Sequence, residues 1–363
     1  MSRRHRPARA ALALLVAGAL IAPVSVAAGA GPVPTWAYYY IWFNVSSWDR
    51  AKIDYPLLGR YSSDEPSVML KHVRLAKKAG IDRFIVSWKS TPVLDRRLQL
   101  LARVAAAERF KLAIIYQGLD FHRRPLPVAR ISRDLGRFSR RFARLPALRG
   151  PGKPTVIWSG TWEFSRHELA SVTSRHRHRL RILASERNAR DYRAKARAFD
   201  GDAYYWSSVN PDTYPDYSGK LASMARAVHA TGGRWIAPAA PGFDGTLVGH
   251  PTVVPRHDGE TLRRELNAAQ RSNPDAIGLI SWNEFSENSH IEPSEKYGTK
   301  ALEVVADVNR TKLQAGDELD SSQPSGGAVA GLGAIPATLT FVGLGLASVY
   351  LLSRRRRRSY GRR

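Results

Sequence analysis

Short apolar or β-rich runs alternate with amphipathic stretches through the middle of this chain, and this alternation constrains the fold more than any other feature. Eight runs are predicted to be strands, at residues 36–42, 83–88, 111–117, 155–159, 180–185, 203–206, 235–239 and 277–282. Helical patterns follow at residues 66–79, 94–108, 131–145, 166–174, 189–199, 219–230, 259–272 and 300–308. Eight strands, each followed by a helix, predict an α/β fold of the (β/α)8 class, a TIM barrel. A doubly wound sheet is the competing arrangement, but it usually has fewer strands and a glycine-rich first turn, which this sequence lacks.

The two ends of the chain have the patterns of targeting segments. Residues 1–30 begin with four arginines, continue into an apolar run and end in small residues, which predicts a secretory signal peptide. An uncleaved anchor is the alternative, but about 13 apolar residues are too few to span a bilayer. Residues 328–352 carry no charge and precede seven arginines, which predicts a membrane-spanning helix, rather than a buried core helix, with a cytoplasmic tail at residues 353–363. The polar residues 314–327 predict a flexible linker, so residues 31–313 are expected to form a domain outside the cell.

The formal charge of +25 is unevenly distributed. Residues 123–197 contain 20 Lys or Arg against five Asp or Glu. Such an excess suggests nucleic acid, anionic lipid or an acidic polymer as a partner. Predicted export and the absence of a recognisable nucleic-acid-binding motif argue against specific nucleic-acid binding, so an anionic lipid or envelope polymer is the favoured partner. The chain has no cysteine and its histidines show no ligand spacing, so we predict neither a metal site nor a cofactor.

The loops after the predicted strands are unusually aromatic and acidic. In a (β/α)8 barrel these loops carry the chemistry. Aromatic rings stack on sugar faces while carboxylates and amides bind hydroxyl groups, so this mixture favours a carbohydrate substrate. Aromatic residues at strand ends also close barrel cores, and that alternative remains open for each of them. The candidate substrate-binding residues are Tyr39, Tyr40, Trp42, Trp88, Tyr116, Gln117, Trp206, Phe243, Asp244, Asn283 and Glu292.

Two glutamates, Glu284 and Glu287, follow the last predicted strand. If the chain turns helical there, they lie on one face, about 5 to 6 Å apart at Cβ. Retaining glycosidases hold two carboxyl groups about 5 to 5.5 Å apart. Two close carboxylates do not ionise together easily, so one keeps its proton as an acid while the other acts as a base. A solvated acidic loop is the alternative, but the position at a strand end favours a catalytic pair.

Five segments resemble glycoside hydrolase family 99, the endo-α-mannosidases, and the resemblance extends from about residue 38 to about residue 292. These segments are Tyr-Pro-Leu-Leu-Gly-Arg-Tyr-Ser-Ser at residues 55–63, Pro-Ser-Val at 66–68, Phe-Ile-Val-Ser-Trp at 84–88, Pro-Ala-Ala-Pro-Gly-Phe-Asp at 238–244 and Asn-Glu-Phe-Ser-Glu at 283–287. The resemblance implies a (β/α)8 fold and a retaining reaction through a 1,2-anhydro sugar. It also implies that Glu284 is the base on the sugar 2-hydroxyl and that Glu287 is the acid and then the base at the glycosidic oxygen.

Two motifs depart from the family pattern. Phe285, Ser286 and Asn288 stand where the family has Trp, His and Gly, and Gln117 stands where its third-strand motif has a glutamate. These departures affect the expected mannoside specificity more than the reaction class. We therefore expect an extracellular, membrane-tethered glycoside hydrolase that cuts within an α-linked mannan- or glucan-type polysaccharide or glycan. The alternative is a catalytically inactive glycan- or cell-wall-binding protein on the same barrel, with Ser286 and Gln117 marking the loss of catalysis.

Overall fold

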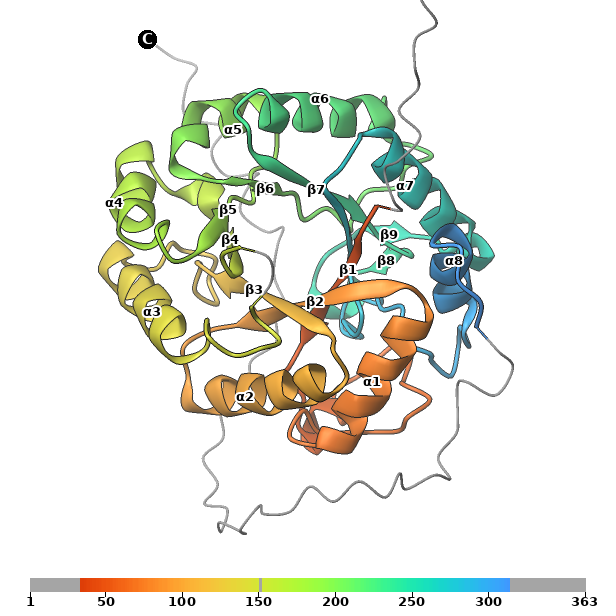
Figure 1. Ribbon diagram of the computed structural model, residues 1–363. Coiled ribbons are helices and arrows are strands. Elements are labelled where there is room, and N and C mark those ends of the chain that lie inside the picture. The colour runs from red at the N-terminus through yellow and green to blue at the C-terminus, as the bar shows by residue number, and fades with distance from the viewer. Residues whose placement is uncertain (1–32, 150–151, 314–363) are drawn as a thin grey trace, which may run out of the picture. The chain divides into compact units, whose positions relative to one another are not determined.

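The computed structural model describes residues 33–149 and 152–313, and this part of the chain forms a barrel of parallel strands surrounded by helices (Figure 1). The predicted signal peptide, linker, membrane-spanning segment and cytoplasmic tail lie outside the described residues. Within the described ranges, no helix combines the length and apolar character needed to cross a membrane.

Eight strands make the barrel, all parallel to their neighbours. They lie side by side in the order β5-β4-β3-β2-β1-β10-β7-β6. A parallel bridge between Ala184 and Asp202 joins the two edges of this sheet, so the barrel is nearly closed. The strands are β1 (Thr35–Tyr40), β2 (Ile81–Trp88), β3 (Lys111–Gln117), β4 (Thr155–Ser159), β5 (Arg181–Leu183), β6 (Gly201–Ala203), β7 (Arg234–Ala239) and β10 (Ala276–Leu279). The predicted (β/α)8 architecture is therefore confirmed.

One α-helix follows each barrel strand, as the alternation predicts. Pro66 opens α1 and Gly80 lies just past its end with a φ of 73°, which are the positions that proline and glycine favour. At α4, Ser165 and Glu168 form a capping box in which each side chain accepts the other's backbone N–H. The helices are α1 (Pro66–Lys78), α2 (Pro92–Ala107), α3 (Val128–Arg141), α4 (Arg166–His176), α5 (Ala189–Lys195), α6 (Tyr217–His229), α7 (Glu260–Arg271) and α8 (Lys300–Val308), with short 3-10 turns at Val45–Trp48, Thr161–Glu163, Ala196–Ala198, Thr246–Val248 and His257–Gly259.

Alternate residues of each strand face opposite sides, which divides the core into two layers. One layer fills the barrel, where Tyr38 of β1, Ile85 of β2, Ile115 of β3 and Ile157 of β4 belong to a single buried cluster. The other layer lies between the strands and the helices and holds most of the remaining apolar side chains. A residue one position away from an inward-facing side chain therefore contacts helices rather than the barrel interior.

The sixth strand differs from the prediction. It covers Gly201–Ala203 rather than residues 203–206, because the backbone of Gly201 approaches β7 so closely that a Cβ would lie 2.1 Å from the carbonyl oxygen of Arg234. Glycine and aspartate are uncommon in strands, so propensity points past them to the aromatic residues that follow. A small hairpin, β8 (Phe243–Asp244) with β9 (Val253–Val254), was also not predicted.

Candidate active site

The loop after β10 carries Glu284 and Glu287 at the carboxyl ends of the strands, where the mouth of the barrel lies. Residues 285–288 form a turn, so the condition under which the two glutamates would share a helix face is not met. The chain instead folds back on the strand end, because the backbone N–H of Ser281 donates to the carbonyl oxygen of Ser289 (2.6 Å) and that of Ile291 donates to Ser281 (2.9 Å). The two glutamates thus occupy a closed loop whose two ends meet.

The two carboxyl groups differ in how they are held. Glu284 is only 2% exposed, and its Oε1 accepts the backbone N–H of Ser286 at 3.0 Å. Its own backbone N–H donates to the hydroxyl of Ser281 at 2.8 Å. Glu287 is half-buried, and no hydrogen bond from the described residues reaches its carboxylate. One carboxyl group is therefore fixed, while the other remains open to a ligand in the mouth.

Burial perturbs both acids, and repulsion by Glu287 adds to the effect on Glu284. Burial, and then the negative charge of Glu287, raise the pKa of Glu284 to about 8. Burial also raises the pKa of Glu287 to about 7, while the positive charge of Arg123 acts in the opposite direction. Because the two groups interact, their titration belongs to the pair. The pair retains a proton near neutral pH, as an acid and base acting together require.

Tyr40 and Tyr205 form one wall beside these acids. Their hydroxyl groups are 2.6 Å apart. Burial raises the pKa of each tyrosine well above its usual value, and the charges of Glu284 and Glu287 add to this effect. The ring of Trp42 lies 4.3 Å from that of Tyr40. The arrangement presents an aromatic surface and two hydroxyl groups to the same space as the carboxyl pair.

Two cations near the pair were missed by the sequence reasoning. Lys52 comes from the loop after β1, and burial lowers its pKa while the charge of Glu284 raises it. Arg123 comes from the loop after β3 and interacts with Glu287. In the sequence both resemble ordinary basic loop residues, because their approach to the glutamates depends on how distant loops fold. Tyr205 was also missed, although its position two residues after the inward-facing Ala203 was a usable signal.

Asn283 and Glu292, both predicted to bind substrate, are fully buried, and their polar groups are hydrogen-bonded within the protein. The amide of Asn283 accepts the backbone N–H of Tyr40 (2.8 Å) and donates to the carbonyl of Tyr40 (3.0 Å) and the hydroxyl of Tyr61 (3.3 Å). The carboxylate of Glu292 lies 2.9 Å from both the His72 ring and the Tyr61 hydroxyl. This corrects the prediction: both residues support the site from behind, because none of their polar groups faces the mouth.

Four predicted aromatic contacts also lie behind the barrel wall. Tyr39, Trp88, Tyr116 and Trp206 belong to, or pack against, the layer between strands and helices. Trp88, for example, is completely buried and donates to Asp95 of α2 at 3.1 Å. The expectation that these four residues line the substrate site is corrected: strand alternation turns Tyr39, Trp88 and Tyr116 towards the helices, and Trp206, which lies beyond the end of β6, stacks on Tyr217 of α6.

Gln117, Asp244 and Phe243 complete the predicted set. Gln117 is half-buried, and its amide lies 3.3 Å from the hydroxyl of Ser87 on the neighbouring strand. Asp244 is half-buried and its backbone N–H donates to the carbonyl of Glu287 at 2.8 Å, whereas Phe243 is only 4% exposed. Gln117 and Asp244 therefore lie around the mouth, and Phe243 packs beneath it.

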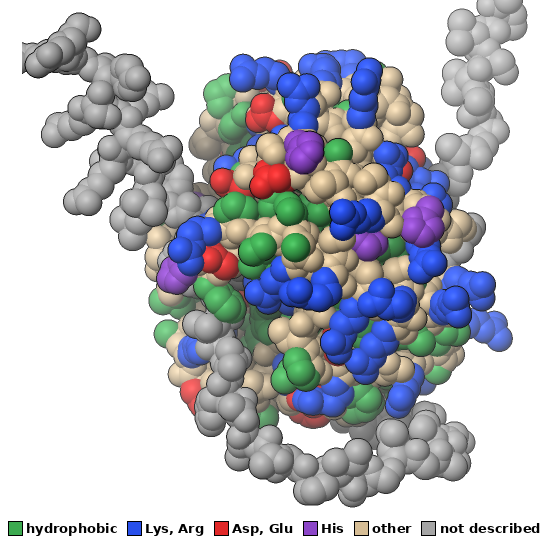
Figure 2. Space-filling model, turned by 90° about the vertical axis from the view of Figure 1, so that its left-hand side faces the viewer, with side chains coloured by type: hydrophobic (Ala, Val, Ile, Leu, Met, Phe, Trp, Pro, Cys, Tyr) green, Lys and Arg blue, Asp and Glu red, His purple; other side chains and the backbone are tan. Residues whose placement is uncertain are grey.

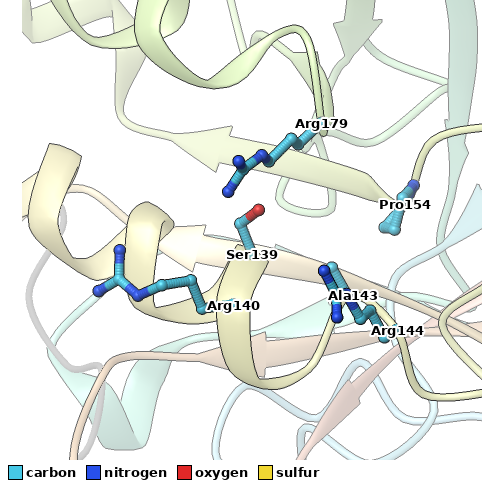
Figure 3. A pocket seen from close by; sticks show the side chains of 6 residues that line it. All are labelled: Ser139, Arg140, Ala143, Arg144, Pro154 and Arg179. Atoms are coloured by element: carbon cyan, nitrogen blue, oxygen red, sulfur yellow. The ribbon is translucent and has the colours of Figure 1, made fainter.

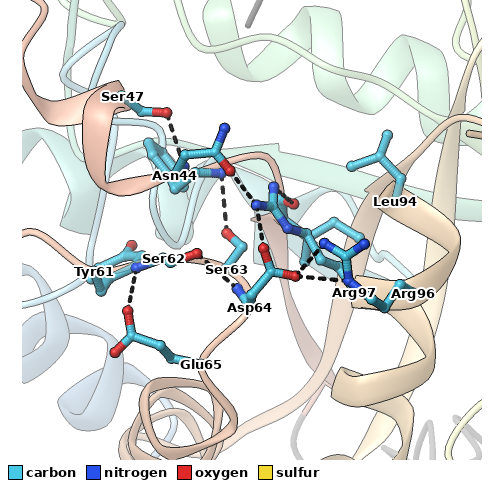
Figure 4. Close-up of polar contacts among 12 residues, drawn as sticks. Asn44, Ser47, Tyr61, Ser62, Ser63, Asp64, Glu65, Leu94, Arg96 and Arg97 are labelled. Atoms are coloured by element: carbon cyan, nitrogen blue, oxygen red, sulfur yellow. Dashed lines mark hydrogen bonds and ion pairs between the residues drawn. The ribbon is translucent and has the colours of Figure 1, made fainter. Parts of the chain in front are cut away.

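A buried arginine holds the loop after β1 (Figure 4). Arg97 of α2 is 2% exposed and donates to the carbonyl of Ile41 (3.1 Å), to Asp64 (2.7 Å) and to Asn44. A planar guanidinium that spans three acceptors restrains the loop at both ends. Lys52 and Tyr61 lie between Asn44 and Asp64 in the sequence. By binding both ends of this segment, Arg97 helps to position Lys52 and Tyr61.

His290 and Asp54 support the loop after β10. Their side chains are 3.1 Å apart, and the ring of His290 stacks on Phe285 at 3.9 Å. Burial lowers the pKa of His290 to about 3, so the ring is neutral. Burial alone would raise the pKa of Asp54, but hydrogen bonds from His290, Ser294 and Lys296 bring it to about 2. The neutral His290 ring donates a hydrogen bond to the charged Asp54 carboxylate, which holds the ring in place. Because the ring stacks on Phe285, it also restrains that residue, which lies between the two glutamates.

The outer surface carries two basic cavities. Figure 2 shows the face on the side of α3 and α4, where Lys and Arg outnumber Asp and Glu. A cavity of about 490 Å³ is lined by Ser139, Arg140, Ala143, Arg144, Pro154 and Arg179 (Figure 3). A second, of about 400 Å³, is lined by residues in and just after α4 and α5 that include Arg166, Arg177, Arg193, Lys195 and Arg197. Neither contains a predicted site residue. In the described part of the chain, no cluster of three or more His, Asp or Glu is placed to hold a metal ion.

Comparison with known proteins shows what the fold resembles. No protein-family model and no curated protein sequence matches the chain. Among solved structures, the GH99 endo-α-mannosidase from Bacteroides thetaiotaomicron, in complex with BIS-TRIS-propane, is 20% identical over 77% of this chain and 97% of that chain, with a TM-score of 0.69. Another structure of that enzyme is 18% identical over 77% and 99% of the two chains (TM-score 0.67), and a glycoside hydrolase-like protein is 16% identical over 80% and 97% (TM-score 0.61). The chain therefore has a GH99-like fold.

Proposed function

We propose that the protein is a retaining glycoside hydrolase that cuts within an α-linked mannan- or glucan-type glycan, with Glu284 and Glu287 as its catalytic residues. The observation that carries the proposal is the pair itself. Two carboxyl groups with raised pKa values lie in one closed loop at the mouth of the barrel, beside Tyr40, Tyr205 and Trp42. The GH99-like fold supports the same reaction class.

The proposed reaction starts from the form of the pair in which its one shared proton is on Glu287 and Glu284 is ionised beside Lys52. Glu284, which is fixed by Ser286, takes the proton of the sugar 2-hydroxyl as that oxygen attacks C1. Glu287, which is open to the mouth, gives its proton to the glycosidic oxygen as the C1–O bond breaks, and a 1,2-anhydro sugar forms. In the second half, Glu287 takes a proton from the water that attacks C1, and Glu284 returns its proton to the 2-oxygen. The bond is hydrolysed with retention, and both residues return to their starting states.

Tyr40 and Tyr205 are proposed to hydrogen-bond the sugar next to the bond that breaks, and Trp42 to stack on a sugar face. Gln117 and Asp244 are proposed to bind hydroxyl groups further along the mouth. Lys52 balances the charge that Glu284 carries when it is ionised. No metal or cofactor takes part in this scheme.

The test compares wild type with Glu287→Gln on α-mannan and α-glucan oligosaccharides. We expect cleavage by wild type and a loss of at least about 100-fold in the variant, the size typical of a lost acid–base group. Glu295→Gln is the matched control, because Glu295 is exposed and lies beyond the same strand. Equal cleavage by Glu287→Gln and wild type refutes the assignment. Tight glycan binding by wild type without turnover of any α-glycan supports the alternative, a glycan-binding protein on this barrel.

We also propose that the barrel is tethered outside the cell, on the basis of the sequence of residues 1–30 and 328–363. The basic outer surface would then lie near anionic lipid or an acidic envelope polymer. Protease treatment of intact cells tests the orientation: the barrel should be degraded while a tag on the C-terminus remains protected. A protected barrel in intact cells contradicts the proposed location.

A further inference from the structure

Three neighbouring strands place a basic cluster at one side of the mouth. Arg123 follows β3, Trp162 and Glu163 follow β4, and Arg187 follows β5, and these strands are adjacent in the sheet. The guanidinium of Arg187 lies 4.1 Å from the ring centroid of Trp162. Among the described residues, no ion pair joins either guanidinium group to a carboxylate.

The turn before Arg123 contains one acid, Asp120, whose carboxylate binds residues other than Arg123. The carboxylate of Asp120 accepts the backbone N–H groups of His122 (2.9 Å) and Arg124 (2.8 Å) and pairs with the Arg124 side chain at 3.0 Å. Arg123 itself has a φ of 59°, in the left-handed region that non-glycine residues rarely adopt. The turn therefore holds Arg123 in a defined place while leaving its guanidinium group without a local carboxylate partner.

Arg123 and Arg187 lie close enough to repel each other. Burial and the charge of Arg187 lower the pKa of Arg123, while Glu287 and Glu163 act in the opposite direction. Glu287 comes from the loop after β10, and β10 is separated from β3 by two strands in the sheet, so Arg123 interacts with a loop that is not adjacent to its own. Two guanidinium groups with like charge thus follow nearby strands at the mouth, and one of them interacts with the open carboxyl group of Glu287.

We propose that Arg123 and Arg187 form a subsite for an anionic substituent on the sugar chain, so that the substrate is an acidic glycan. This inference rests on the proposed function, because it specifies the substrate of the same site. The ligand chemistry is a carboxylate, sulfate or phosphate group, since a guanidinium group binds such oxyanions through paired N–H donors. Trp162 holds Arg187 in position through the face of its ring. The anion is expected near the bond that breaks, because Arg123 interacts electrostatically with both Arg187 and Glu287.

The experiment measures binding separately from turnover. The full chain carrying Glu287→Gln is titrated with matched pairs of glycans: a phosphorylated α-mannan and its dephosphorylated form, an α-galacturonan and its methyl ester, and a sulfated α-mannan and its unsulfated form. We expect one acidic member to bind at least about tenfold more tightly than its neutral partner. The pair that shows this difference identifies the anion as phosphate, carboxylate or sulfate.

Arginine substitutions then assign the preference to the mouth. Arg187→Gln, at an exposed position, and Arg123→Gln should each weaken binding of the acidic glycan about tenfold and leave the neutral form unchanged. The control is Arg144→Gln with Arg179→Gln, which removes two charges from the outer cavity (Figure 3). This control should change binding less than about twofold. Equal binding of acidic and neutral glycans, or an equal loss in the control, overturns the proposal.

The outcome is distinguishable from failure of the hydrolase assignment. If wild type cleaves neutral α-glycans with no preference for acidic ones, the hydrolase assignment stands and the anion subsite is refuted. If acidic glycans bind through Arg123 and Arg187 but wild type cleaves none of them, the subsite stands and the hydrolase assignment is refuted. Thermal unfolding of each variant within about 2 °C of wild type shows that the substitutions leave the barrel folded.

Discussion

Replacement of Asn283 by alanine tests how the loop after β10, which carries Glu284 and Glu287, is attached to the barrel. The strand β10 ends at Leu279, whereas its neighbour β1 continues to Tyr40. The backbone N–H and carbonyl of Tyr40 therefore have no strand partner on that side, and the Asn283 amide binds both, at 2.8 and 3.0 Å. Asn283 and Tyr40 are 0% and 4% exposed, so water does not replace these bonds in the native protein.

The structure sets the size of the effect. Asn283→Ala leaves two buried backbone groups unsatisfied, each at about 1 to 3 kcal/mol, so the free energy of unfolding should fall by about 2 to 6 kcal/mol. The lower end applies if water enters the space that the side chain leaves. Since domains are stable by about 5 to 15 kcal/mol, the variant is expected to fold with a much lower urea midpoint. Glycan cleavage should fall as well, because the same amide positions Tyr40 against the loop that carries Glu284.

Urea unfolding of the full chain in mild detergent, followed by tryptophan fluorescence, measures this change. Asn267→Ala is the control, because Asn267 is exposed on α7 and its loss should change stability by less than about 0.5 kcal/mol. Asn283→Asp provides a second arm. Its protonated carboxyl can still donate to the Tyr40 carbonyl, so its stability deficit should grow as the pH rises. An unfolding free energy for Asn283→Ala that differs from wild type by less than about 0.5 kcal/mol, which is about the error of the method, refutes this reasoning.

Three further predictions concern other parts of the proposed site. The folded-state pKa of Glu284 is raised to about 8, so ionisation of its carboxyl group lowers the free energy of unfolding as the pH rises from about 5 through 8. Glu284→Gln removes this cost. The unfolding free energy of the variant minus that of wild type, measured in urea, should therefore be at least about 1 kcal/mol higher at pH 9 than at pH 5. Tyr205→Phe should lower kcat at least about tenfold, whereas Tyr204→Phe, the same change on the opposite strand face, should leave kcat within about twofold. Trp88→Ala should lower the unfolding free energy by about 3 to 5 kcal/mol without weakening glycan binding at low temperature, whereas calorimetric titration of Trp42→Ala should show weaker binding with little loss of stability.

The fold was predictable because its signal is repeated eight times. Each apolar run and each helical pattern reports the same architecture, so an error in one element does not change the class. The sixth strand shows the limit: Gly201 and Asp202 have low strand propensity, yet the chain pairs there because only glycine allows such close contact with β7. Propensity describes a residue alone, whereas strand pairing depends on its neighbour.

The site was predictable in sequence position but less so in orientation. Glu284 and Glu287 lie where a barrel places its chemistry, and both are at the mouth. Tyr39 and Tyr40 look equivalent in the sequence, but only Tyr40 shares the inward face with Tyr38. That distinction needs the strand register, because a shift of one residue exchanges the two faces. The burial of Glu292 was beyond any local pattern, since its partners His72 and Tyr61 come from distant segments.

In the structure, two groups of arginines from residues 123–197 lie at opposite ends of the barrel. Arg140 and Arg144 lie at the carboxyl end of α3, and helices in this fold run opposite to the strands, so these arginines lie at the end of the barrel away from the mouth. Arg123 and Arg187 belong to the same segment but follow strands, which brings them to the end of the barrel that carries Glu284 and Glu287. An acidic polymer would be attracted by both groups, and salt would weaken both contacts. Salt dependence therefore does not distinguish substrate binding at the mouth from binding at the outer surface. Substitution of arginines at one end of the barrel, compared with substitution at the other end, does.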